Sequence, residues 1–285
     1  MPSLIDIRRR IRSVKNTQQI TKAMKMVSAA KLRRAQDRAL AARPYAAMLN
    51  QILANVAEAA AQGGGADHPL LAVRPENRIL AIVVTADRGL AGGFNSNLLR
   101  LAQRFVDEHR ASELLFEVIG KKSRDYFRKR GARIRGEHID IFRHLRFENA
   151  EAIADAVIDM FSKAEIDSVY LFVNEFKSVL ASKLTATRLL PIEVPKSGQT
   201  VDYIYEQKPE ELLGSLLPRY VKMQIYRALL ESGAAEHAAR MTAMESATKN
   251  ATEAIDRLTL YMNRVRQASI TREIIEIVSG AAALD

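Results

Sequence analysis

The sequence contains no cysteine, no tryptophan and only five histidines. The lack of cysteine excludes a disulfide framework, a thiol nucleophile and thiolate zinc sites. No two histidines stand four residues apart, which argues against a histidine-rich metal centre. Aromatic residues make up 6% of the chain, so stacking platforms for single-stranded nucleic acid are scarce. The longest apolar run, 79–86, has the length of a strand, and no direct membrane span is predicted.

Positive charge is concentrated at the start of the 285-residue chain. Residues 1–44 contain 12 lysines and arginines and two acidic residues, which accounts for the whole net charge of +10. Such a segment needs an anionic partner: nucleic acid, lipid headgroups or an acidic protein surface. The composition also resembles a mitochondrial transit peptide, but a removable peptide has no need of the helical register that this segment shares with residues 46–56.

Residues 1–61 are predicted to form one long helix, because apolar or small residues recur at alternating spacings of three and four. The register never slips, which is typical of a coiled coil. At 1.5 Å per residue the helix would be roughly 80 Å long, and Pro44 is expected to bend it near residues 40–44. The stripe consists of Leu4, Ile7, Ile11, Val14, Gln18, Thr21, Lys25, Ser28, Leu32, Ala35, Ala39, Ala42, Ala46, Leu49, Leu53 and Val56.

Residues 209–285 show the same spacing and are expected to form a second long helix that begins at Pro209. Pro218 and Gly233 are expected to mark irregularities in it. Because the chain leaves along one helix and returns along the other, the two are expected to pair as an antiparallel coiled coil. The clearest part of the second stripe is Met241, Met244, Thr248, Ala251, Ile255, Leu258, Met262 and Val265.

Between the two helices, strand and helix patterns alternate, which indicates a mainly parallel, Rossmann-like α/β domain. Its expected bounds are 79–195, with linkers at 62–78 and 196–208. Strands are expected at 79–85, 114–119, 132–139, 169–173 and 184–192, and helices at 97–109, 121–130 and 148–164. The predicted fold class is therefore α/β plus a long antiparallel coiled coil made by the terminal helices.

The second helix is longer than the first. If position 56 lies opposite position 209, Leu4 lies opposite about residue 261 and some 20 residues are left over, on the order of 30 Å of single helix. Either this tail folds back on its own α/β domain or the register estimate is wrong, or else another protein supplies a socket for the tail. The apolar residues in the tail are Ile270, Ile274, Ile275, Ile277, Val278, Ala281, Ala282, Ala283 and Leu284.

Four successive seam positions in the first helix are polar: Gln18, Thr21, Lys25 and Ser28. One interpretation is that helix drift moves the seam to the neighbouring apolar stripe of Ile20, Met24 and Val27. The other is that the coil is loosened there and presents Met24, with Lys22 and Lys25, to a second protein.

A glycine-rich loop at 85–95 follows a predicted strand and precedes a helix, where phosphate loops occur. It lacks the dinucleotide fingerprint, because Ala91 stands where the second glycine belongs, and it lacks a Gly-Lys-Ser/Thr ending. A tight turn or a protein-contact loop is favoured over a phosphate site. Asp87 and Arg88 could form a catalytic pair, but such residues more often cap a helix or form a salt bridge. No catalytic residue, cofactor or metal site is predicted.

Two other classes of protein remain as alternatives. A basic coiled-coil nucleic-acid-binding protein would show DNA affinity that falls steeply with salt. An α/β enzyme with helical dimerisation arms would bind a nucleotide at residues 89–95.

Three stretches carry a resemblance to a known family: residues 7–27 (IRRRIRSVKNTQQITKAMKMV), 87–95 (DRGLAGGFN) and 266–282 (RQASITREIIEIVSGAA). The family that they resemble is the gamma subunit of F-type ATP synthase, bacterial type, and the likeness extends over the whole chain. Where the family often has cysteine or serine, this chain has Ala91.

The resemblance implies a central-stalk rotor that couples proton flow through the membrane ring to conformational cycling of the nucleotide sites in the alpha/beta ring, without a catalytic site of its own. The implied partners are the alpha and beta subunits, the epsilon subunit and the membrane ring of c subunits, and not nucleic acid. The implied location is peripheral, at the cytoplasmic face of the bacterial cell membrane.

The same resemblance assigns partner contacts to named residues. It implies that Met24 and Lys25, with Lys22, lie near acidic loops of beta subunits, and that Arg266 and Gln267 make polar contacts with beta-subunit loops. The C-terminal tip is expected to sit in an apolar sleeve of the alpha/beta ring. The tip residues assigned to this contact are Ile270, Ile274, Ile277 and Val278.

Overall fold

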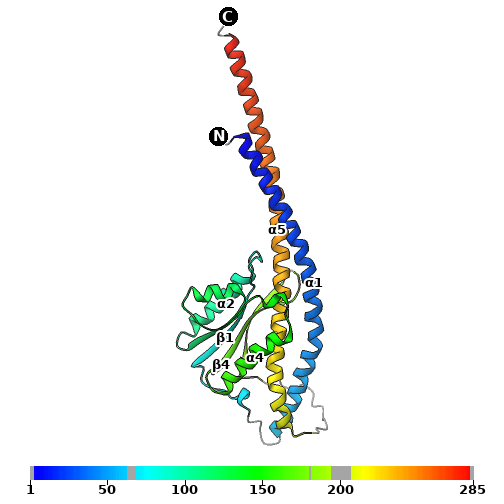
Figure 1. Ribbon diagram of the computed structural model, residues 1–285, viewed down its shortest axis with the longest axis vertical. Helices are drawn as coiled ribbons and strands as arrows, with labels where there is room; N and C mark the ends of the chain where they lie inside the picture. Colours follow the sequence, from blue (N-terminus) through cyan, green and yellow to red (C-terminus); the bar gives the residue numbers. More distant parts are fainter. Residues whose placement is uncertain (1–2, 63–67, 180, 194–206, 283–285) are drawn as a thin grey trace. The chain divides into compact units, whose positions relative to one another are not determined.

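The computed structural model describes residues 3–62, 68–179, 181–193 and 207–282 (Figure 1). These residues belong to two compact units, one made of 1–28 with 241–285 and the other of 29–240. Two long helices, α1 (Leu4–Gln62) and α5 (Pro209–Ala282), contribute to both units. The remaining helices are α2 (Phe94–Glu108), α3 (Lys121–Arg128), α4 (Phe147–Ser162) and the short 3₁₀ helices Pro69–Leu71 and Ile141–Arg143.

A five-stranded, mainly parallel sheet forms the centre of the unit 29–240. Its strands lie in the order β3-β2-β1-β4-β5, and only β5 runs antiparallel to its neighbour. The expected alternation of strands and helices is confirmed, with most bounds shifted by one to three residues. The strands are β1 (Arg78–Val84), β2 (Glu113–Ile119), β3 (Arg133–His138), β4 (Ser168–Phe176) and β5 (Ser182–Leu190).

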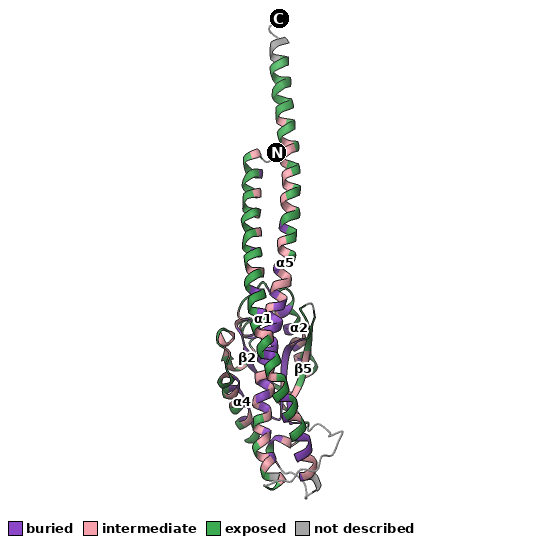
Figure 2. Cartoon of the chain, turned by 90° about the vertical axis from the view of Figure 1, so that its right-hand side faces the viewer, coloured by how far each residue is buried: buried purple, intermediate pink, exposed green. Residues whose placement is uncertain are grey.

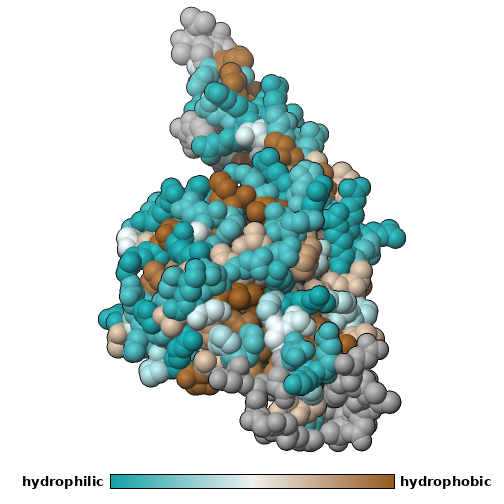
Figure 3. Space-filling view, turned by 60° about the horizontal axis from the view of Figure 1, so that its bottom comes forward, coloured by the Kyte–Doolittle hydropathy of each residue, from teal (hydrophilic) through white to brown (hydrophobic). Residues whose placement is uncertain are grey.

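Both faces of the sheet are covered by helices, so β1 is buried on both sides and is apolar at every position after Arg78. Its residues Ile79, Ala81 and Val83 pack with α2 and Phe127 of α3. The alternate residues Leu80 and Ile82 pack with α4 and with the parts of α1 and α5 that belong to this unit. The long helices thus complete one of the two cores. Figure 2 marks these buried residues on the helices, and the face shown in Figure 3 is predominantly hydrophilic.

Neither proline nor glycine interrupts the long helices. Pro44 lies inside α1, and Pro218 and Gly233 lie inside α5. The expected irregularities at Pro218 and Gly233 are therefore not observed as breaks. Packing explains the continuity at Pro218, because Leu213 and Leu217 just before it are fully buried and hold the helix on the core.

In the unit made of 1–28 and 241–285, α1 and α5 pair side by side (Figure 1). A reciprocal cap starts α1: the Asp6 amide donates to Ser3 Oγ, and the Ser3 amide donates to the Asp6 carboxylate. The predicted stripe faces α5, since Ile7 and Thr21 on it are buried. No helix among the described residues is both long and apolar enough to cross a membrane.

Position 120, between β2 and α3, requires glycine for two reasons: its backbone has a positive φ, and a backbone carbonyl lies close to it. Its φ is +90°, and an added Cβ would lie 2.2 Å from the carbonyl oxygen of Thr85. We expect Gly120→Ala to lower the free energy of unfolding by about 3 kcal/mol or more, because the backbone at Thr85, directly after β1, is held by its hydrogen bond to Ile119 and cannot move away. Urea unfolding of purified protein measures the change.

Gly131→Ala is the matched control. Gly131 has a φ of +66°, but nothing lies within 4 Å of its added Cβ. The strain of the left-handed conformation alone should cost about 1 kcal/mol. Equal losses for the two variants would contradict the role assigned to the contact with Thr85.

Candidate partner-binding surfaces

Three polar side-chain pairs join α1 to α5 in the unit made of 1–28 and 241–285. They occupy successive positions of the predicted seam, at its polar stretch. Each pair spans more than 200 residues of sequence, so the pairs report the register of the two helices directly. They are Gln18 Nε2–Thr252 Oγ1 at 2.7 Å, Thr21 Oγ1–Thr248 Oγ1 at 2.8 Å and Lys25 Nζ–Glu245 Oε1 at 2.6 Å.

The polar seam therefore stays where the heptad spacing places it. Thr21 and Ser28 are 7% and 3% exposed, whereas Ile20 and Val27 are 59% and 55% exposed. The interpretation in which drift moves the seam to Ile20, Met24 and Val27 is wrong. Hydrogen bonds across the interface satisfy the polar groups, so these groups can remain in the seam.

The sequence-based register is corrected by the same pairs. It placed residue 18 opposite about residue 247, but Gln18 bonds to Thr252. That register assumed that the helices are level at residues 56 and 209. Because α1 continues to Gln62, its residues lie opposite positions farther along α5.

The three residues assigned to an acidic partner differ in their surroundings. Lys22 is exposed and makes no ion pair with any described residue. Lys25 is half-buried, and its charge is already matched by Glu245. Met24 is half-buried beside them. Of the two lysines, Lys22 thus offers the unmatched charge for an anionic partner.

The C-terminal tip of α5, residues 270–278, is exposed. Helix α5 continues past the start of α1 in this unit (Figure 1), and Arg266 and Gln267 are exposed. The interpretation in which the tail folds back on its own α/β domain is wrong, because the assigned tip residues lie open. Exposed fractions are 48% for Ile270, 55% for Ile274, 72% for Ile277 and 61% for Val278. Side chains from residue 280 onward, including Ala281, Ala282, Ala283 and Leu284, lie outside the described ones.

Sequence reasoning missed other exposed apolar residues on this unit. Ile5 is 75% exposed on α1, and Leu260 and Tyr261 are 62% and 43% exposed on α5. The sequence did indicate that these three residues are exposed, because they lie outside the seam positions of their helices. They add to the exposed apolar area that the tip contributes to this unit.

In the glycine-rich loop between β1 and α2, the amides near both ends bond within the chain. The Ala86 amide donates to Asn95 Oδ1, and the Phe94 amide donates to the carbonyl oxygen of Ala91. The carboxylate of Asp87 accepts the amides of Lys121 and Asp140. These contacts fasten the two ends of the loop to the fold, which favours the tight-turn interpretation, and they give Asp87 a capping role.

Arg240 of α5 fastens this loop, which the sequence reasoning missed. Its guanidinium donates to the carbonyl oxygens of Arg88 and Gly89, at 3.5 and 3.3 Å, and lies 2.7 Å from Glu236. Both side chains of the Arg240–Glu236 pair are about one-tenth exposed. The sequence did contain an indication of the Glu236–Arg240 pair, because an acidic residue and an arginine stand four residues apart in a run of small residues.

Burial shapes the protonation of the residues beside Arg240. Burial raises the pKa of Glu236, against the opposing charge of Arg240. Burial also lowers the pKa of His237 to about 4, and the charges of Arg240 and Lys31 act in the same direction. The Nδ1 atom of His237 is buried without a hydrogen-bond partner among the described residues. The neutral imidazole is therefore the form that the fold accepts.

Comparison with known proteins agrees with this geometry. The family model described as ATP synthase matches residues 3–284. Over the full length of both chains, the protein is 63% identical to the ATP synthase gamma chain of Solibacter usitatus (strain Ellin6076). It is 54% identical, again over both full lengths, to that of Anaeromyxobacter sp. (strain Fw109-5).

The chain belongs to the ATP synthase gamma chain family.

Solved structures support the gamma-chain assignment. A central stalk and c-ring structure of Tetrahymena thermophila mitochondrial ATP synthase contains a chain with 28% identity and a TM-score of 0.62, covering 80% of this chain and 99% of that one. A rotor structure of Euglena gracilis mitochondrial ATP synthase has 20% identity and a TM-score of 0.67, with coverage of 94% and 98%, and supports the fold. The two long helices that pack together are thus a shared feature of the gamma-chain fold.

The buried imidazole predicts a pH dependence of stability in this gamma chain. His237 takes up a proton near pH 4 when folded but near 6.5 when unfolded, so stability falls as pH is lowered through this window. Replacement by a neutral side chain, His237→Gln, should remove this loss, which is at most about 3 kcal/mol. Urea unfolding at pH 7 and pH 5 measures it.

Glu236, whose pKa is shifted the other way, is present in both proteins and cancels in the comparison. The exposed His144 provides the control, and His144→Gln should lose as much stability on acidification as the parent chain. An unchanged pH dependence in His237→Gln would rule out the assigned protonation.

Proposed function

We propose that this gamma chain is the central-stalk rotor of an F-type ATP synthase, and that it couples proton flow through a membrane ring to conformational cycling of nucleotide sites in an alpha/beta ring. The chain itself contributes no catalytic group. The observation that carries the proposal is the exposed apolar tip at residues 270–278, a part of α5 with which no other described helix of the chain pairs.

An isolated helix with an exposed apolar surface is marginal in water, so the tip needs an external apolar wall. Apolar contact is non-directional, and its free energy changes little as one surface turns against another. A ring of alpha and beta subunits around the tip would therefore hold the shaft on its axis and leave it free to rotate.

The coupling follows from asymmetry. A two-helix shaft presents a different face in every direction, so subunits that surround it meet different side chains. Three beta subunits of identical sequence are then held in different conformations, and rotation exchanges those conformations. This is a coupling free energy between distant sites, because each face of the shaft favours one conformation of the subunit that it contacts.

Electrostatic attraction would strengthen the contact between the ring and the shaft. Lys22 and the exposed arginines of α1 fit acidic loops of beta subunits, with Met24 as an apolar neighbour and Lys25 as a partly neutralised one. Arg266 and Gln267, exposed at the base of the tip, are suited to polar contacts with beta-subunit loops. The epsilon subunit and the ring of c subunits are proposed as partners of the α/β unit. The proposed location is peripheral, at the cytoplasmic face of the bacterial membrane.

The tip can be tested by truncation. Removal of the last dozen residues, 274–285, should leave the isolated chain folded, because the described tip side chains are exposed. The same truncation should lower the amount of alpha and beta subunits that co-purify with the chain from membranes by several-fold. Circular dichroism and urea unfolding report the fold, and subunit stoichiometry reports assembly.

Ser269→Ala, a change on the same helix that removes no apolar contact, is the control for the truncation. Native complexes should contain one copy of this chain with alpha and beta subunits. A chain that never co-purifies with them would refute the rotor proposal, whereas unfolding of the truncated chain would place the tail in the chain's own core.

Charge reversal is expected to have different effects at Lys22 and at Lys25. Lys22→Glu should lower the number of protons pumped per ATP hydrolysed in reconstituted vesicles, since its charge has no match within the described chain. Lys25→Glu should also weaken the coil by up to about 1 kcal/mol, because it faces Glu245. The double variant Lys25→Glu with Glu245→Lys restores that pair and should recover the coil stability. Unchanged pumping by Lys22→Glu would count against the acidic-loop contact.

A further inference from the structure

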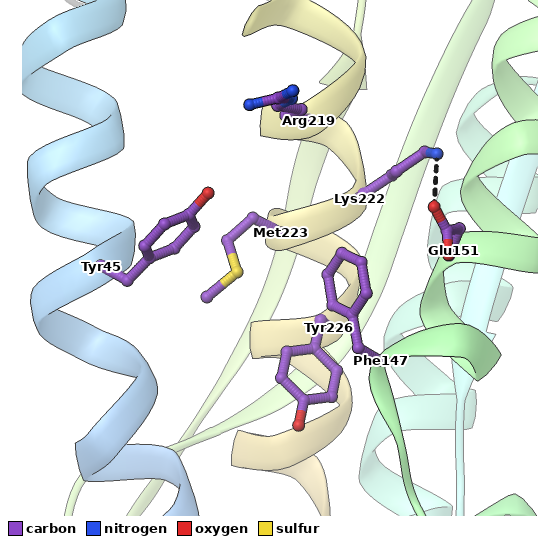
Figure 4. Close-up of a pocket in the computed structure, with 7 residues that line it drawn as sticks. All are labelled: Tyr45, Phe147, Glu151, Arg219, Lys222, Met223 and Tyr226. Atoms are coloured by element: carbon purple, nitrogen blue, oxygen red, sulfur yellow. Dashed lines mark hydrogen bonds and ion pairs between the residues drawn. The ribbon is translucent and has the colours of Figure 1, made fainter.

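A hollow in the unit 29–240 lies where α1, α4 and α5 meet (Figure 4). Its volume is about 500 Å³, which is enough for several side chains of another protein. It belongs to none of the surfaces described above, and it lies within one compact unit. The residues that line it are Tyr45, Phe147, Glu151, Arg219, Lys222, Met223 and Tyr226.

The walls of this hollow have the composition of a protein-binding surface. Tyr45 and Phe147 are 56% and 40% exposed, although both are large and apolar in body. Phe147 and Tyr226 pack edge to face with their ring centres 5.4 Å apart, which fixes both rings. Met223 forms the buried floor. Aromatic residues, methionine and arginine are the types enriched at interface cores, where pre-ordered rings bind at little entropic cost.

The charges around the hollow are unbalanced. Lys222 is fully engaged, since its Nζ atom lies 2.8 Å from Glu151 and 2.9 Å from Asp155. Arg219, on the same helix and exposed, makes no ion pair with any described residue. Figure 4 shows its side chain directed away from the Lys222–Glu151 pair. The hollow thus presents one free guanidinium, which a carboxylate of a partner would match.

An exposed apolar stripe on α1 continues this surface. Tyr45, Met48 and Ile52 follow one another at spacings of three and four residues and are 56%, 64% and 36% exposed. Residues spaced in this way form a straight ridge on one side of a helix. The ridge on α1 lies beside a hollow that α4 and α5 also bound. Ridges and grooves of this kind are the surface features into which a further helix packs.

We propose that this hollow and ridge dock an amphipathic helix of a partner protein. Apolar side chains of that helix fill the space between Tyr45 and Phe147 and cover Met48, and an acidic side chain about one turn away pairs with Arg219. The proposal concerns residues 29–240 alone and does not depend on the roles of Lys22 or of the C-terminal tip.

Photocrosslinking in the native complex tests the occupant. Met48→p-benzoylphenylalanine places a photoreactive group on the ridge, and the complex is purified from membranes, irradiated and analysed by mass spectrometry. The expected product joins Met48 to an apolar residue in a helical segment of another subunit, with an acidic residue within one turn. The same group at Arg104, which is exposed on α2, should not label that segment.

Charge exchange tests the polar contact. Arg219→Glu should lower the yield of the Met48 crosslink at least five-fold, and replacement of the partner's acidic residue by arginine should restore it. Arg104→Glu, a reversal at an arginine that likewise makes no ion pair with any described residue, should leave the yield unchanged. Urea unfolding of Arg219→Glu checks that the exposed change leaves the fold intact, and Arg219→Gln replaces it if the midpoint moves.

Several outcomes would overturn the proposal. They are the absence of any crosslink, a crosslink only to lipid or to a second copy of this chain, labelling of a strand or of a segment without an acidic residue, and an unchanged yield in the Arg219 variants. Each of them can occur in a complex that still contains alpha and beta subunits, so failure here is distinguishable from failure of the rotor proposal.

Discussion

Pairing of α1 with α5 along one seam is the interaction on which the rest of the structure depends. In the unit 29–240 the seam is apolar, and residues such as Leu53 and Val221 are fully buried in a core that also contains the sheet. In the unit made of 1–28 and 241–285 no sheet is present, and the two helices have only one another. There the seam uses hydrogen bonds and an ion pair between side chains.

The difference in seam chemistry has a physical reason. A two-helix coil buries little apolar area, so apolar seam residues alone would leave its register weakly defined. Gln18 and Lys25 each meet one partner on α5 at hydrogen-bond distance, and a shift by one helical turn would separate both pairs. Polar seam residues give up some hydrophobic stabilisation and in return define a single alignment.

The sequence predicted what periodicity and local chemistry control. The three-four stripe located both long helices, because residues buried on one side of a helix recur at that spacing, and the alternation of strand and helix patterns located all five strands. The register was missed, since it depends on where each helix ends. The hold of Arg240 on the loop carbonyls was missed as well, because it joins segments about 150 residues apart and involves backbone atoms that have no sequence signature.

The glycine-rich loop shows that a fold can be kept without the ligand site that it usually carries. It follows β1, and β1 is flanked by β2 and β4, which is the point where doubly wound sheets bind nucleotides in other proteins. Here the amides of Ala86 and Phe94 bond within the loop, Asp87 caps α3, and Arg240 donates to two of the loop's carbonyl groups. The missing glycine at Ala91 pointed the same way. The Rossmann-like fold is therefore retained, while the loop at its usual ligand position is fastened by contacts within the chain.

Directional and non-directional contacts are divided between the two ends of the unit made of 1–28 and 241–285. Where the helices pair, each polar contact specifies one partner atom at one distance, and the alignment is fixed. At residues 270–278 the exposed apolar side chains are isoleucine and valine, which bind any apolar wall almost equally well in many orientations, and the charged Arg272, Glu273 and Glu276 lie among them. The proposed function, that of a shaft which stays internally rigid and turns within its surroundings, requires this division. If the chemistry were reversed, with polar groups at the tip and an unspecific apolar seam, the helices could slide past one another while the tip remained locked to its socket.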